Sequence, residues 1–257
     1  MNVIVKTIRL QMLNSWVRPM FRFCLIANPI MNTLFLYEMF LHSKETNFLA
    51  YVVFGSGLMA LWGCICFSSV GDINRERYMG TLPLIYASPT SFGLIIIGKI
   101  IGNTLLSMSG IVVSLITAKL ITRDHIRIGS PGYLILSLLL AMISFSAVAL
   151  CIAYLLMISR KTTLYMNLLE IPVIMLCGFT FPIEVMPQWA QMIAKLIPIT
   201  WVIKLIRMSI AGVTNGNEYR TIFLVSLLTI GICILLTWKL YRTIDRQIRV
   251  KATLEVS

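Results

Sequence analysis

The sequence predicts an all-α integral membrane protein with six transmembrane helices. Hydrophobic residues make up 58% of the 257 residues, charged residues make up 12%, and the mean hydropathy is +0.87. Soluble domains are roughly half apolar and a quarter charged, so this composition excludes an ordinary soluble domain. A span needs about 20 residues, and the chain length therefore fits about six spans in a single domain, residues 1–257.

Residues 1–22 are expected to form an amphipathic helix in the inner membrane interface, and no cleavable signal peptide is indicated. Four apolar residues recur at helical spacing, and two arginines fall on the opposite face. A frayed basic tail is the alternative interpretation. The apolar residues are Val5, Ile8, Met12 and Trp16, and the arginines are Arg9 and Arg18.

Six apolar segments are long enough to span a membrane or nearly so. An even number of spans places both termini on one side of the membrane. Basic residues gather on the cytosolic side, so the nine near the two ends predict cytosolic termini in the cell membrane. Arg123, Arg127 and Arg220 are exceptions to this orientation. The predicted spans are 23–41, 48–70, 92–121, 133–158, 164–181 and 222–238.

A charged segment, residues 72–91, separates the second and third predicted spans and faces the cytosol in this orientation. Its charges of both signs are expected to form a helical turn that contacts a partner protein. An ordinary solvated loop is the alternative. The residues that carry this prediction are Arg75, Glu76, Arg77, Gly80, Thr81 and Leu82.

Residues 178–200, between the fifth and sixth predicted spans, are neither a clean span nor a polar loop. Interrupted backbone at membrane depth needs protein or a water-filled cavity to satisfy its polar groups. A re-entrant pair of short helices on the outer side satisfies this condition, and an interfacial loop anchored by Trp189 is the alternative. The interruptions are Pro182, Glu184, Pro187, Lys195 and Pro198.

Glu170 lies inside the fifth predicted span, where an unpaired carboxylate costs about 2.5 to 3.5 kcal/mol. It is expected to face protein or water. A contact with Asn167 on the same helix, a salt bridge with Lys99 on the third span, and direct contact with a transported substrate all remain open. The candidate path residues are Asn28, Asn32, Asn103, Asn167, Glu170, Met175, Phe179 and Phe181.

The sequence shows no catalytic centre and no metal site. The six cysteines fall in or beside apolar runs, and the two histidines, His42 and His125, are far apart in the sequence. The run from Gly93 to Lys99 matches the start of a P-loop, but Ile100 follows where the motif needs a hydroxyl. Gly98 and Gly102 instead form a small-residue pair that permits close helix contact.

Two blocks of sequence resemble the type-2 ABC exporter permeases. The first runs from Asn74 to Pro89, and the second joins Gly178–Pro187, Ile197–Trp201 and Arg207. Their order and spacing match those permeases over nearly the whole chain. Two departures lie in the first block: Pro83 stands where these permeases usually have Glu, and two residues rather than one separate Arg77 from Gly80.

The resemblance implies the membrane subunit of an ABC exporter that moves an amphiphilic substrate such as a drug, an antimicrobial peptide or a lipid-like molecule. Polysaccharide carriers share the family. The implied partners are a second permease, identical or homologous, and two ATPase subunits that bind ATP and Mg. The coupling segment would contact those subunits, and this chain would carry neither an ATPase site nor a cofactor.

Juxtamembrane anchoring explains the net charge of +12 without nucleic acid. An ATP-independent membrane protein, either a secondary transporter or an immunity or assembly factor, is the alternative.

Overall fold

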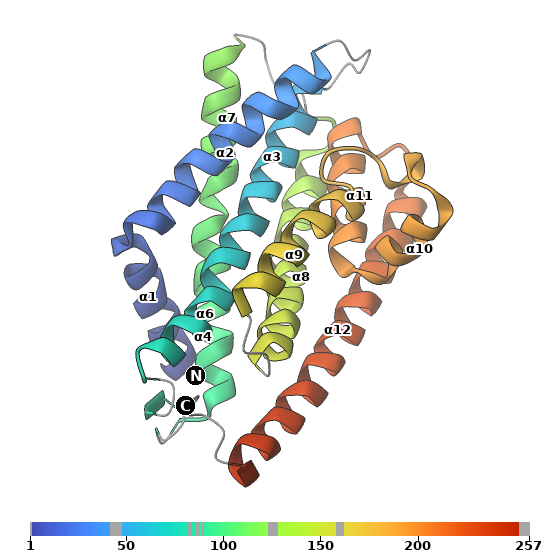
Figure 1. The fold of residues 1–257 in the computed structure, drawn as a ribbon. Helices are drawn as coiled ribbons and strands as arrows, with labels where there is room; N and C mark the ends of the chain where they lie inside the picture. Colours follow the sequence, from blue (N-terminus) through green and yellow to red (C-terminus); the bar gives the residue numbers. More distant parts are fainter. Residues whose placement is uncertain are drawn as a thin grey trace.

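A computed structural model describes residues 2–41, 48–81, 84, 85, 88, 90–122, 128–157 and 162–251. These residues form helices and turns and contain no strand. Five helical segments are long and apolar enough to cross a membrane, which confirms five of the six predicted spans. Figure 1 shows most of these helices side by side in one bundle. The five segments are Pro19–Phe40, Phe48–Ser68, Phe92–Ile121, Pro131–Met157 and Gly216–Ile244.

The fifth predicted span, 164–181, is shorter in the structure than expected. Helix α9 covers Thr162–Leu176 and contains Pro172. The chain then turns at Gly178, whose φ of 81° lies in the left-handed region that favours glycine. Because of this turn, α9 is shorter than the roughly 20 residues of an ordinary span.

The N-terminal helix α1 covers Asn2–Val17, so it ends before residue 22. Arg18 is extended, and Pro19 starts α2 (Pro19–Phe40), as proline often does at a first helical position. Helix α1 packs closely on α6, Phe92–Ser107. A methyl group placed on Gly102 would lie 2.9 Å from the Ile8 carbonyl oxygen. The predicted small-residue pair therefore serves the contact between α1 and α6.

Helix α3, Phe48–Ile65, lies at the centre of the bundle, and nearly all of its residues are buried. It continues through the π-helix Cys66–Val70 (η1) into α4, Gly71–Tyr78. The third span is made of α6 and of α7, Ser109–Ile121, which meet at Met108. A methyl group on Gly57 would lie 2.8 Å from Ile111, so glycine also permits the close approach of α3 and α7.

The remaining helices are α8 (Pro131–Met157), the 3₁₀ turn η2 (Ile183–Val185), α10 (Gln188–Leu196), α11 (Pro198–Ala211) and α12 (Gly216–Lys251). Helix α11 packs against both α8 and α12. Helix α11 therefore starts inside the predicted segment 178–200 and continues to Ala211. In Figure 1, α4 and the start of α1 lie at one end of the bundle, and α10 and α11 lie toward the other.

Candidate functional site

Two carboxylates of α4, those of Asp72 and Glu76, point into the protein, whereas the side chain of Arg75 is half-exposed. The expectation that this segment contacts a partner protein stays a prediction. Glu76 is only 9% exposed, and its carboxylate forms an ion pair with Lys99 of α6. Of the three possibilities left open for Glu170, the salt bridge with Lys99 is not formed in the part of the chain that the structure describes, because Lys99 pairs with Glu76. Lys99 follows Glu76 by 23 residues in the sequence, and the two side chains meet because α4 lies beside α6.

Asp72, one turn before Glu76, is also buried. Its carboxylate pairs with Arg18 and accepts a hydrogen bond from the Gln11 side chain, and Arg75 Nη2 lies 3.9 Å away. Hydrogen bonds continue from α1 to α6, because the Asn103 side-chain oxygen accepts from Ser15 at 2.7 Å and from Gln11 at 3.2 Å. This end of the bundle is the one that the sequence predicts to be cytosolic, so we call this set the inner polar cluster: Gln11, Ser15, Arg18, Asp72, Glu76, Lys99 and Asn103.

The last residue of α4 and the first residues after it are exposed and mainly apolar. Tyr78 is 83% exposed and Met79 is 66% exposed, and Leu84 is also exposed. Gly80 has a φ of 67°, and the Thr81 amide donates to the Glu76 carbonyl at 3.0 Å, so the chain turns sharply after the helix. We call Tyr78–Gly80 the inner tip. Of the predicted coupling residues, Leu82 and the side chain of Arg77 lie outside the described residues.

Two of the predicted path residues meet at a glycine of α3. A methyl group on Gly63 would lie 3.1 Å from Glu170 Oε1 and 3.2 Å from Asn28 Nδ2. Trp62, which is fully buried, donates to the Glu170 carbonyl at 3.3 Å and fixes α9 beside α3. No hydrogen bond or ion pair joins the Glu170 carboxylate to another described side chain. The half-buried carboxylate and carboxamide therefore form a polar spot between α2, α3 and α9.

The other predicted path residues do not join this spot. Asn103 belongs to the inner polar cluster, and Phe179 is buried in the core, where its ring centroid lies 6.0 Å from that of Phe145. Asn167 and Met175 lie exposed on α9, and Asn32 and Phe181 are half-buried on other segments. The sequence placed all of them at membrane depth, but it could not show which helix face each one occupies.

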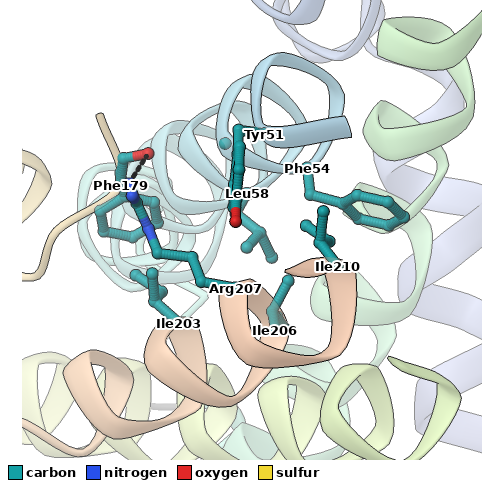
Figure 2. Close-up of a pocket in the computed structure, with 9 residues that line it drawn as sticks. Tyr51, Phe54, Leu58, Phe179, Ile203, Ile206, Arg207 and Ile210 are labelled. Atoms are coloured by element: carbon teal, nitrogen blue, oxygen red, sulfur yellow. Dashed lines mark hydrogen bonds between the residues drawn. The ribbon is translucent and has the colours of Figure 1, made fainter. Parts of the chain in front are cut away.

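Arg207 of α11 donates hydrogen bonds to the non-helical backbone that follows α9. Figure 2 shows its side chain reaching the backbone of Phe179 beside Tyr51. Its guanidinium donates to the carbonyl oxygens of Gly178 at 2.8 Å and Phe179 at 3.3 Å, and it lies 5.8 Å from the Tyr51 ring centroid. These bonds satisfy carbonyls that no helix satisfies there. A cavity of about 10 Å³ beside them is no larger than the space one water needs.

The prolines of the predicted re-entrant segment start and flank helices. Pro187 precedes α10 and Pro198 begins α11, while Pro182 precedes the turn that holds Glu184. Partial burial alone would raise the pKa of Glu184, but its own backbone amide and Lys204, with Nζ 3.2 Å from Oε1, hold the pKa below its usual range. This exposed pair links η2 to α11.

The fold and these sites define a polytopic helical membrane protein whose inner end holds a short helix by buried ion pairs. Residues 4–211 match the family model described as ABC-2 type transporter. The chain therefore belongs to the ABC-2 type transporter family and is a permease component, not itself the ATPase of such a transporter. A comparison with curated proteins gives no significant match.

Proposed function

We propose that this chain is the membrane subunit of an ATP-driven exporter in the cell membrane, with six spans if α9 and its neighbours complete one crossing and with both termini cytosolic. It pairs with a second permease, identical or homologous, and with two ATPase subunits that bind ATP and Mg. The observation that carries this proposal is the inner polar cluster beneath an exposed, apolar inner tip. Such a tip offers a partner an apolar contact surface, and the buried ion pairs hold α4, which carries the tip, against the other helices.

The ion pairs supply a route for mechanical coupling. When the ATPase subunits close, they displace the inner tip and with it α4. Because Glu76 is paired to Lys99 of α6, and Asp72 to Arg18 between α1 and α2, this displacement pulls on three helices at once. Buried pairs resist separation more strongly than exposed ones, since each partner would be left charged in a poorly solvated place.

The proposed substrate is amphiphilic and reaches the polar spot formed by Asn28 and Glu170. The exposed face of α9 next to this spot is strongly apolar, which suits the apolar part of such a molecule and also the interface with the second permease. An isolated carboxylate among apolar groups favours substrates with a cationic group. The exposed apolar residues of this face are Leu164, Leu168, Ile171 and Met175.

The coupling proposal is tested by co-purification of the ATPase subunit with variants of the inner tip. Met79→Arg is expected to reduce the co-purified ATPase, because it places a charge in the apolar contact. Thr243→Arg, at an exposed position near the cytosolic end of α12, is the control. Glu76→Gln is expected to keep the ATPase bound but to reduce export. Normal ATPase binding by Met79→Arg would contradict the proposed contact, and export without any ATPase partner would favour an ATP-independent carrier.

A further inference from the structure

A groove between α6, α8 and α12 lies apart from all the sites described above. Its volume is about 270 Å³, and its lining is mainly apolar. Leu94 of α6 and Ile234 of α12 are exposed residues in this lining, while Leu150 of α8 is half-buried. The groove therefore opens on the outside of the bundle, where lipid chains surround a membrane protein.

With both termini cytosolic, as proposed above, the mouth of the groove lies at the cytosolic interface. It is lined by Trp238 and Tyr241, which stand near the cytosolic end of α12. The Tyr241 ring packs on α6, since a methyl group on Gly93 would lie 3.2 Å from it, and its centroid lies 5.6 Å from that of Tyr154. Tryptophan and tyrosine favour the depth of the lipid headgroups, so the groove runs from that depth into the hydrocarbon region.

The positively charged side chain of Arg242 lies beside Trp238 at the mouth of the groove. The Arg242 guanidinium lies 3.7 Å from the centroid of the Trp238 ring, and Arg242 is exposed. Stacking on an aromatic face uses the flat side of a guanidinium and leaves its N–H edges free for a phosphate. Among the described residues no carboxylate pairs with Arg242. The mouth therefore carries a positive charge that faces the headgroup region.

We propose that this groove binds an anionic phospholipid of the inner leaflet, with one acyl chain along α6, α8 and α12 and the phosphate at Arg242. Drug-sized ligands fill pockets of roughly 300 to 1,000 Å³, so a groove of this volume suits part of a single acyl chain better than a bulky cargo. The cationic mouth matches the negative charge of such a lipid. The groove shares no residue with the polar spot of Asn28 and Glu170, so we assign it to lipid binding rather than to transport.

Native mass spectrometry of the purified transporter tests this proposal. The delipidated protein in detergent is titrated with phosphatidylglycerol or with phosphatidylcholine, and the bound molecules are counted. The wild type is expected to retain one phosphatidylglycerol more tightly than phosphatidylcholine. Arg242→Gln should weaken phosphatidylglycerol about fivefold, the effect of about one interfacial charge, and Arg242→Lys should keep most of the affinity. Leu94→Trp should fill the groove and remove this binding step.

Matched controls separate a local effect from a general one. Leu228→Trp makes the same change at an exposed position of α12 outside the groove, and Arg9→Gln removes another exposed cytosolic charge. Both should bind phosphatidylglycerol as the wild type does. Equal retention of the two lipids by the wild type would overturn the anionic specificity. Unchanged binding in a monodisperse Leu94→Trp protein would overturn the location, and so would equal losses in Leu94→Trp and Leu228→Trp.

Discussion

At the scale of single residues, the ion pair of Glu76 and Lys99 is expected to contribute most to the stability of the inner polar cluster. Both side chains are largely buried, with 11% and 16% of their surfaces exposed. Removing one partner strands the other, so Glu76→Gln and Lys99→Met should each cost about 3 kcal/mol in free energy of unfolding. The double variant should cost clearly less than the sum. Denaturant titration of the detergent-solubilised protein measures the three values.

The exposed pair of Glu184 and Lys204 provides the control for this cycle. Exposed pairs contribute about 0 to 1 kcal/mol, so Glu184→Gln should leave stability nearly unchanged at pH 7. The small contribution of this pair is present above the ordinary pKa of a glutamate and is lost as the pH falls through the lowered pKa of Glu184. Additive effects of Glu76→Gln and Lys99→Met would contradict the buried pair.

Glu170 is the second residue with a testable role. Because no described side chain pairs with its carboxylate, Glu170→Gln should leave the melting temperature unchanged or raise it. It should reduce the export of cationic substrates and spare neutral ones, since only the former lose a counter-charge. Export assays with matched cationic and neutral amphiphiles measure this difference, and Glu38→Gln on an exposed position of α2 is the control. Equal loss for both substrates would point to a structural role instead.

At the scale of helices, the contact between α1 and α6 depends on glycine. A methyl group on Gly102 would lie 2.9 Å from a backbone oxygen of α1, and backbone cannot move aside as a flexible side chain does. Gly102→Ala should therefore lower the melting temperature and open the inner polar cluster. Gly231→Ala, at a helical glycine with open space around it, should be neutral or stabilising by up to about 1 kcal/mol. Differential scanning fluorimetry compares the two, and equal melting temperatures would contradict a tight contact.

The sequence predicted helix positions better than helix partners. Long apolar runs locate spans because the length of an apolar run can be read from the sequence alone. The pair of Gly98 and Gly102 likewise predicted a close helix contact. Which charges meet is decided by the three-dimensional path, so the sequence left a pair of Lys99 with Glu170 open although Lys99 pairs with Glu76. The end of α9 was also missed, because apolar residues continue past the turn at Gly178. Asn103 and Phe179 show the same limit, since sequence gives depth but not the direction of a side chain.

At the scale of the whole molecule, the orientation of the bundle is testable. In Figure 1, α4 lies toward one end of the bundle, and α12 runs toward that end from its start beside α10. Asn217→Cys should react with a membrane-impermeant maleimide in intact cells, whereas Met79→Cys should react only after permeabilisation. The native cysteines lie in the spans or beside them, and the wild type measures their background. Labelling of position 79 from outside would reverse the orientation.

The inner polar cluster also bears on how the protein is made. Gln11 lies 61 residues before Asp72 and 92 residues before Asn103, its two partners across the cluster. A ribosome that adds 5 to 20 residues per second needs roughly five to twenty seconds to synthesise this stretch. During that interval α1 has no α6 to dock on, and its glutamine and serine must stay in contact with water at the membrane surface. Helix α1 is thus synthesised well before α6 and cannot reach its final place until α6, the first half of the third span, has been made.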